Sequence, residues 1–230
     1  VETRRVGSPT RLEVDEDMPD KLVDMFANKL GLHPLMVFRS TAPLSLVSFW
    51  DLMSLNRPDL KDAPFLPYVH PDLMPEKSLM ASVDRRDRLF YHPYDSFVPL
   101  VTFLKQAAND PQVLAIKITL YRIDKHSPIV EALMEARENG KAVAAVVELK
   151  ARFDEENNIV WARRLEDAGV HVVYGLMDLK VHAKLLLVVR RKGDSIVRYC
   201  HMSSGNYNAQ TARVYGDIGY LTADREIGAD

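Results

Sequence analysis

Cysteine is nearly absent from this chain, since Cys200 is the only one among 230 residues. A single thiol excludes an intrachain disulfide bond and fits a reducing compartment. Because Cys200 lies in an apolar strand pattern, we interpret it as a core residue rather than a nucleophile. The sequence also lacks a secretory signal and any apolar run long enough to cross a bilayer. These absences predict a cytoplasmic protein and leave association with the inner face of the membrane open.

An excess of charge of one sign is missing as well. The chain has 30 basic and 32 acidic residues and a formal net charge of −2. This balance excludes a generic nucleic-acid binder, and we expect no nucleic-acid partner. The composition, 47% hydrophobic and 27% charged, is that of a globular protein with one large or two modest domains. Any anion-binding site must therefore come from local clustering of basic residues.

The ends of the sequence predict a piece of a longer protein. The first residue is Val1 rather than methionine, and the sequence stops at Asp230 directly after a well-formed segment. Within the chain, residues 57–75 contain five prolines, a density that excludes regular structure. We place a domain boundary near residue 93, between an α+β region (1–93) and an α/β region with a mixed sheet (94–230).

Hydrophobic periodicity predicts the elements of both regions. In the first, short strands at residues 11–14 and 36–39 accompany a helix from Pro19 to Leu30, and residues 44–53 look helical. In the second, strands alternate with helices, which implies right-handed parallel crossovers. The strands are expected at 114–120, 143–149 and 170–174, the helices at 96–108, 128–139 and 155–168, a hairpin at 181–190 and 196–202, and a last strand at 218–221.

Three basic residues follow the predicted parallel strands at an even spacing. Arg122, Arg152 and His182 are each 30 residues apart, about the length of a strand, a helix and two turns. Parallel strands would bring them to one edge of the sheet, where α/β folds bind ligands. Two guanidiniums, an imidazole and the ammonium of Lys184 would suit a polyanion such as a phosphate chain.

His182 and Lys184 are two apart on a predicted strand, which would place both side chains on the same face. A neutral imidazole can attack phosphorus, and an ammonium beside it can hold the phosphate oxygens. The alternative for so short a motif is a surface strand pair. The polar loop 203–208 follows the hairpin and could bring backbone N–H groups and the amides of Asn206 and Asn208 to the same anion, although it could also be a plain turn. The two motifs together are more specific than either one.

The order of these motifs resembles the phospholipase D superfamily, whose pattern has an aspartate five residues after the lysine. Val189 occupies that position, so the ordinary phosphodiesterase form of the motif is broken. Longer motifs closely resemble the polyphosphate kinase family of ATP:polyphosphate phosphotransferases, and the similarity covers essentially the whole chain. These motifs are ITLYR (118–122), ELKARFDEE (148–156), LKVHAK (179–184), GNYN (205–208) and TARVY (211–215).

This resemblance implies a role for each region and for several residues. Residues 1–93 look like the latter part of the family's head domain, and residues 94–230 like the first of its two phospholipase D-like catalytic domains. His182 matches the phosphorylated histidine, and Tyr215 matches a nucleotide-contacting tyrosine. Arg122 and Arg152 match arginines associated with Mg²⁺.

The chemistry of arginine limits that last assignment. A guanidinium has no lone pair to offer and stays charged, so Arg122 and Arg152 cannot be direct ligands of Mg²⁺. We expect them to bind phosphate oxygens bidentately while the ion binds other oxygens of the same phosphates. Surface salt bridges to Asp154 or Glu155 are the alternative.

The resemblance therefore implies reversible transfer of the terminal phosphate of ATP to inorganic polyphosphate through a phosphohistidine on His182. Lys184, Arg122 and Arg152 would bind the phosphoryl oxygens, with Mg²⁺ as cofactor and ATP, ADP and polyphosphate as partners. The full-length enzyme is expected to be a homo-oligomer, and residues 1–230 alone are expected to fold but to be inactive. Two alternatives stay open: a phospholipase D-type phosphodiesterase or nuclease, and a non-catalytic module that docks polyphosphate.

Other residues carry weaker expectations. His201 is expected to hydrogen-bond near the polar loop rather than to act as a nucleophile. Glu148 could pair with Lys150 or orient Arg152. Three aromatic residues are interpreted as packing residues: Tyr121, Trp161 and Tyr207.

Overall fold

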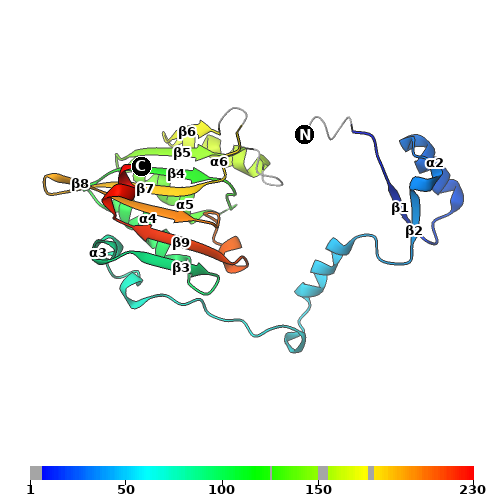
Figure 1. The fold of residues 1–230 in the computed structure, drawn as a ribbon, viewed down its shortest axis with the longest axis horizontal. Helices are drawn as coiled ribbons and strands as arrows, with labels where there is room; N and C mark the ends of the chain where they lie inside the picture. The colour runs from blue at the N-terminus through cyan, green and yellow to red at the C-terminus, as the bar shows by residue number, and fades with distance from the viewer. Residues whose placement is uncertain (1–6, 125, 150–154, 176–178) are drawn as a thin grey trace. The chain divides into compact units, whose positions relative to one another are not determined.

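The computed structural model describes residues 7–124, 126–149, 155–175 and 179–230. The chain forms two compact units, Val1–Pro64 and Phe65–Asp230 (Figure 1). The functional boundary near residue 93, with the domain roles attached to it, stays a prediction. Within the described ranges, no helix is both long enough and apolar enough to cross a bilayer.

The first unit contains two short parallel strands, β1 (Leu12–Asp15) and β2 (Val37–Ser40). Helix α2 (Asp20–Leu30) lies between them in the chain. It ends at Gly31, whose φ of 63° is the left-handed conformation that closes many helices. The two strands and this helix confirm the predicted elements to within one residue at each end.

The rest of the first unit is built from short helical turns. The predicted helix at 44–53 is a 3₁₀ helix, Leu46–Ser54, whose flanking hydrogen bonds close on the third residue, as from Leu55 N to Leu52 O. In the proline-rich connection, regular structure is limited to single 3₁₀ turns, as the proline density predicts. Besides the 3₁₀ helix Leu46–Ser54, the described residues contain four short 3₁₀ turns: Pro34–Met36, Pro58–Leu60 and, in the second unit, Pro71–Leu73 and Thr211–Arg213.

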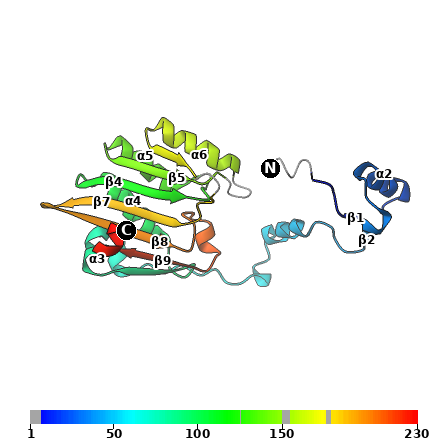
Figure 2. The ribbon, with the colours of Figure 1, turned by 45° about the horizontal axis from the view of Figure 1, so that its top comes forward.

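The second unit contains a seven-stranded mixed sheet (Figure 2). Strands β4, β5 and β6 are parallel, and the other neighbouring pairs are antiparallel. This arrangement confirms the predicted α/β fold class with a mixed sheet. In sheet order the strands are β3 (Arg88–His92), β9 (Asp217–Thr222), β8 (Ser195–Ser203), β7 (Lys184–Lys192), β4 (Val113–Leu120), β5 (Ala142–Val147) and β6 (His171–Tyr174).

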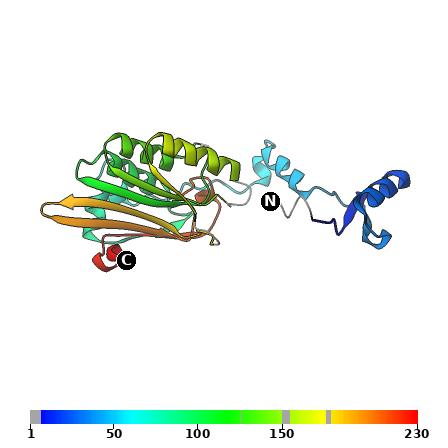
Figure 3. The same cartoon turned by 90° about the horizontal axis from the view of Figure 1, so that it is seen from above.

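Helices α4 (Val98–Asn109), α5 (Pro128–Glu138) and α6 (Glu155–Asp167) cover one face of this sheet (Figure 3). Helix α3 (Leu79–Arg85) packs beside α4. The core lies between the helices and the sheet and includes fully buried side chains from both layers, among them Phe103, Leu104, Ile116, Leu133 and Leu165. Burial of these apolar surfaces is what holds the two layers together.

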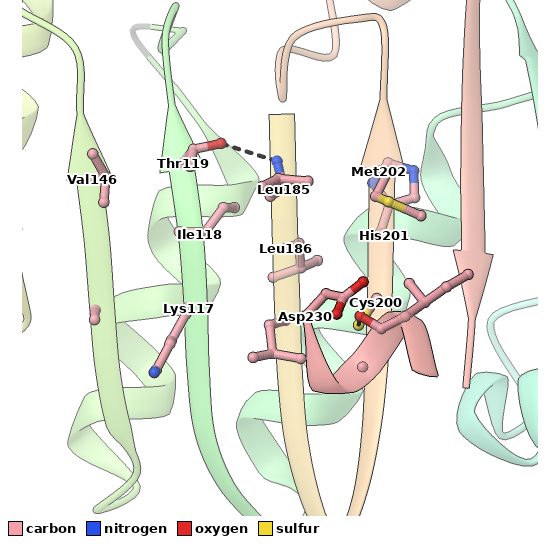
Figure 4. A pocket seen from close by; sticks show the side chains of 14 residues that line it. Lys117, Ile118, Thr119, Val146, Leu185, Leu186, Cys200, His201, Met202 and Asp230 are labelled. Atoms are coloured by element: carbon pink, nitrogen blue, oxygen red, sulfur yellow. Dashed lines mark hydrogen bonds between the residues drawn. The ribbon is translucent and has the colours of Figure 1, made fainter. Parts of the chain in front are cut away.

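The opposite face of the sheet carries the short helix α7 (Arg225–Ala229) and an apolar pocket beside it (Figure 4). Leu185, Leu187 and Met202 line this pocket together with Cys200. Burial raises the pKa of the Cys200 thiol, which agrees with its interpretation as a core residue rather than a nucleophile.

One edge of the sheet collects the sequence motifs. Strands β4, β5, β6 and β8 end at this edge, and β7 and β9 begin there, as their parallel and antiparallel pairing requires. We call the ends of these six strands, with the loops that join them there, the site edge. It lies at the carboxyl ends of the parallel strands, the usual position of ligand sites in α/β folds.

The start of β7 differs from the prediction. The strand begins at Lys184, so His182 lies just before it rather than on it. Two side chains replace the expected strand pairing: Glu148 Oε2 accepts from Val181 N at 2.8 Å, and Thr119 Oγ1 donates to Ala183 O at 2.6 Å. The backbone groups around His182 are therefore bound by side chains, and the segment leaves the regular sheet.

Candidate functional site

Thr119 fixes the backbone at the start of β7. Its hydroxyl donates to the carbonyl oxygen of Ala183 and accepts from Leu185 N at 3.0 Å, the contact drawn in Figure 4. The two bonds lie on either side of Lys184 and next to His182. Sequence reasoning missed Thr119, because a threonine at the end of a strand reads simply as a β-forming residue.

Glu148 fixes the same segment from the end of β5. Its side chain is 3% exposed, and its carboxylate holds the backbone N–H of Val181, which directly precedes His182. The two roles expected for Glu148 involve Lys150 and Arg152, and both of these residues lie outside the described ranges.

His182 and Lys184 are in direct contact. Lys184 Nζ lies 3.0 Å from each ring nitrogen of His182 and donates to the His182 carbonyl oxygen at 2.6 Å. Lys184 is only 4% exposed, whereas His182 is open to solvent. Because an ammonium can only donate, its contact with a ring nitrogen requires a lone pair there, as in the neutral imidazole.

Tyr121 forms one wall of this pair. Its ring meets the His182 ring edge to face, with centroids 4.6 Å apart and an angle of 82°. The ammonium groups of Lys184 and Lys180 lie 5.2 and 5.6 Å from the centre of the Tyr121 ring. Tyr121 is thus a packing residue, as expected, but what it packs against is the candidate nucleophile and its cations.

The electrostatic surroundings favour a neutral His182. Desolvation of the ring lowers its pKa, and the positive charges of Lys184, Lys180 and Arg122 lower it further. Burial likewise lowers the pKa of Lys184, while the negative charge of Asp217 acts in the opposite direction. An exposed imidazole kept neutral by nearby cations is a competent nucleophile toward an anionic phosphate.

The structure brings one of the two predicted arginines to this histidine. Arg122 follows β4 at the site edge, and its charge acts on the pKa of His182. Arg152 lies outside the described residues, and so does Asp154. The expected clamp by two arginines, and the alternative of salt bridges to Asp154 or Glu155, stay predictions.

The polar loop 203–208 follows β8 and lies at the site edge. Asn208 Oδ1 accepts from Gln210 N at 3.0 Å and from Thr211 N at 2.8 Å, so this side chain organises the loop itself. Asn206 Oδ1 is buried, and none of the described residues provides it with a hydrogen-bond partner. The Oδ1 atom of Asn206 can therefore still accept a hydrogen bond from another group.

Asp217, the first residue of β9, is held against this loop. Ser204 Oγ donates to Asp217 Oδ1 at 2.8 Å and accepts from Ile218 N at 3.0 Å. A Cβ atom on Gly205 would lie 2.6 Å from Asp217 Oδ2, so only glycine fits at that position. The close approach places a carboxylate where it influences Lys184.

Tyr215 lies just before β9 and is 55% exposed. Its backbone N–H is bound to Thr211 O at 3.0 Å, which anchors the residue after a 3₁₀ turn. The phenol ring is accessible, as stacking on a nucleotide base would require.

The described residues do not fit a protein-held Mg²⁺ ion. Among them, no group of three or more His, Cys, Asp or Glu side chains gathers where it could hold a metal. The side chains whose charges act on His182 are cationic, and Mg²⁺ prefers oxygen ligands such as carboxylates and phosphates. This part of the site offers donors for phosphate oxygens rather than ligands for an ion.

Comparison with known proteins gives the family. The model described as "Polyphosphate kinase C-terminal domain 1" matches residues 78–230, and the one described as "Polyphosphate kinase middle domain" matches residues 1–52. The chain belongs to the polyphosphate kinase family. The resemblance inferred from the motifs is thereby confirmed.

Relatives and a solved structure support the same family. Polyphosphate kinases of Mycobacterium tuberculosis (strain H37Rv) and Mycolicibacterium paratuberculosis are 52% and 53% identical to this chain over 231 residues, covering 99% of it. A crystal structure of polyphosphate kinase from Porphyromonas gingivalis matches 97% of this chain with a TM-score of 0.81 and 33% identity. The chain spans about a third of the length of these proteins, namely 31% and 32% of the two relatives and 34% of the crystallised chain.

His201 lies inside the core of this polyphosphate kinase chain. It is 2% exposed, and its Nδ1 lies 3.0 Å from the hydroxyl of Tyr207, which is itself buried. The hydrogen bond expected near the polar loop is therefore present. Burial and the charge of His92 lower the pKa of His201 to about 3.

This burial predicts acid sensitivity. The unfolded chain binds a proton on His201 below about pH 6.5, whereas the folded chain resists it down to about pH 3. Above pH 6.5 His201 is neutral in both states, and the free energy of unfolding is at its full value. As the pH falls toward 3, proton uptake by the unfolded chain lowers that free energy, by about 2 kcal/mol between pH 7 and pH 5. Thermal unfolding across that range should show a shallower acid loss for His201→Gln than for the wild type. The matched variant His171→Gln, at an exposed position on β6, should keep the wild-type slope, and equal slopes for all three proteins would contradict the prediction.

Proposed function

We propose that the full-length protein transfers the terminal phosphate of ATP reversibly to inorganic polyphosphate, with His182 as the group that carries the phosphate. The observation that carries this proposal is the contact between an exposed, neutral imidazole and the ammonium of Lys184, beside Arg122. Membership of the polyphosphate kinase family supports it. Because the chain spans about a third of its relatives, the activity is proposed for the whole protein, and residues 1–230 alone are expected to be inactive.

The proposed reaction has two balanced steps. A ring nitrogen of His182 attacks the γ-phosphorus of ATP; the nitrogen–phosphorus bond forms, the bond to the bridging oxygen breaks, and ADP leaves with that electron pair. A terminal oxygen of polyphosphate then attacks the phosphohistidine, and the imidazole recovers its lone pair. Running the steps backward regenerates ATP.

Before ATP binds, Lys184 Nζ lies against both ring nitrogens and donates to the one that carries the lone pair, which must attack. The oxygens of an arriving phosphate are stronger acceptors than the ring, so they would draw the ammonium away and free the imidazole. Arg122, and by the resemblance Arg152, would bind other phosphoryl oxygens, and Asn206 would help to orient the loop or the phosphate. Tyr215 would contact the nucleotide. Mg²⁺ is expected to arrive with the phosphates, and no step here depends on it.

Labelling separates this function from its alternatives. Full-length protein incubated with ATP labelled on the γ-phosphate and Mg²⁺ should take up acid-labile, alkali-stable label and pass it to polymer. In a second assay, a phosphodiester substrate in metal-free buffer should not be cleaved, since Val189 replaces the aspartate of the phosphodiesterase motif. Diester cleavage without labelling would favour the phosphodiesterase, and polyphosphate binding without labelling would favour a docking module.

A further inference from the structure

The first turn of helix α6 contains two asparagines, Asn157 and Asn158, that reach back to the site edge. Asn158, in the first turn of α6, is completely buried. Its Nδ2 donates to the carbonyl oxygen of Tyr121 at 2.7 Å, and its Oδ1 accepts from Ile123 N at 3.4 Å. One side-chain amide therefore holds the backbone on both sides of Arg122. Asn157 adds a short hydrogen bond to Ile123 O.

The same amide also reaches the end of β5. Asn158 Nδ2 donates to Glu148 O at 3.0 Å, so it links the loop after β4 to the residue that follows β5. Both residues touch the histidine segment: Tyr121 through its ring against His182, and Glu148 through its carboxylate on Val181 N. Asn158 is thus one residue away from the His182 segment along two separate routes.

We propose that Asn158 is a positioning residue, which sets Arg122 and the end of β5 relative to His182. This inference rests on the proposed phosphotransfer and extends it to a residue that touches neither phosphate nor nucleotide. Phosphoryl transfer depends on placement of the charged groups, and a misplacement of about 1 Å can cost about a hundredfold in rate. Without the amide, the carbonyls of Tyr121 and Glu148 lose a buried donor and the peptide on either side of Arg122 is released.

The test compares two amides that make the same kind of contacts. In the full-length enzyme, Asn158→Ala should lower kcat at least about tenfold with a smaller change in the KM for ATP. The matched variant is Gln106→Ala. Gln106 also accepts one backbone N–H, from Leu79 at 2.9 Å, and donates to two carbonyls, those of Lys77 at 2.7 Å and Pro75 at 3.4 Å. It lies near the end of α4, which leads to the start of β4 and so to the opposite edge of the sheet. Gln106→Ala should lower thermal stability but keep wild-type kinetics.

A pH profile gives a readout that lost stability alone would not move. Arg122 lowers the pKa of His182, so its displacement should shift the acid limb of kcat to higher pH. The variant leaves the other groups that face His182 chemically unchanged, although Tyr121, whose carbonyl oxygen Asn158 holds, is released together with Arg122. These groups are Lys184 from β7, Lys180 from the segment before it, Tyr121 from the loop after β4 and, through Lys184, Asp217 from β9.

Each outcome decides the question. A variant with wild-type kcat and an unmoved acid limb would overturn the positioning role. If Asn158→Ala fails to fold, Asn158→Ser is measured by the same criteria; if both fail to fold while Gln106→Ala folds, Asn158 is structural and the inference is wrong. Failure of the proposed function looks different, because the wild-type enzyme itself would then carry no phosphate on His182.

Discussion

Replacing His182 by alanine in the full-length enzyme should abolish both the phosphoenzyme and polyphosphate synthesis. The imidazole is the proposed nucleophile and is in contact with Lys184, whereas His201 is buried against Tyr207 and cannot take its place. Loss of a nucleophile typically costs at least about a thousandfold in kcat. The measurement is acid-labile phosphate on the protein after incubation with γ-labelled ATP, together with the yield of polymer.

Two controls define what this experiment shows. His171→Ala removes an exposed imidazole from β6 and should leave labelling and synthesis intact. Unfolding curves for both variants should match the wild type, since His182 is exposed and outside the regular strands. Acid-labile label that persists in His182→Ala would mean that the phosphate is carried elsewhere.

The repeating part of the fold could be predicted because local signals and the global pattern agree there. The strand–helix alternation from β4 to β6 has the expected elements, with Ser127 Oγ accepting from Val130 N and Pro128 as the first residue of α5. Gly140, with a φ of 79°, follows the end of that helix. Such signals lie within a few residues of the element they specify, so a single sequence reveals them.

Strand β3 could not be predicted, because all of its residues except Phe90 reverse the usual apolar pattern. Arg88 and His92 point inward and are 6% and 4% exposed, whereas Leu89 and Tyr91 point outward. The inward Arg88 Nη2 donates to Asp72 Oδ2 at 3.1 Å and to the carbonyl and hydroxyl oxygens of Ser82. Partners that lie 16 and 6 residues away in the chain make this reversal stable, and periodicity carries no sign of them.

In the candidate site, too, some features could be predicted from the sequence and others could not. The 30-residue spacing predicted a shared edge, and the structure does bring Arg122 close enough to act on His182. The position of His182 on a strand is wrong, because Thr119 and Glu148 bind the neighbouring backbone from 64 and 33 residues away. Residue type and spacing thus reveal the groups that do chemistry, while the groups that hold them come only from the fold.

Replacing Lys184 by methionine should slow phosphoryl transfer about a hundredfold or more. The change keeps most of the side-chain volume at a position that is 4% exposed, so the fold should survive while the charge is lost. In the proposed mechanism this ammonium stabilises the phosphoryl oxygens in the transition state, and removal of one such donor commonly costs about 10²–10³ in kcat. The full-length variant is assayed for the rate of phosphoenzyme formation and compared with Lys117→Met, which removes an exposed lysine from β4.

The pH dependence of the same variant separates charge from shape. His182 attacks only when neutral, and Lys184 helps to keep its pKa low, so without Lys184 the imidazole holds its proton to higher pH. The acid limb should therefore move upward, and the rate deficit should be larger at pH 6 than at pH 8. At alkaline pH the wild type should lose activity, because Lys184 gives up its proton and burial lowers the pKa at which it does so. Lys184→Met has no ammonium to lose, so its pH profile should lack this alkaline limb. A variant with a reduced rate but both limbs unchanged would mean that Lys184 acts through packing against Tyr121 rather than through its charge.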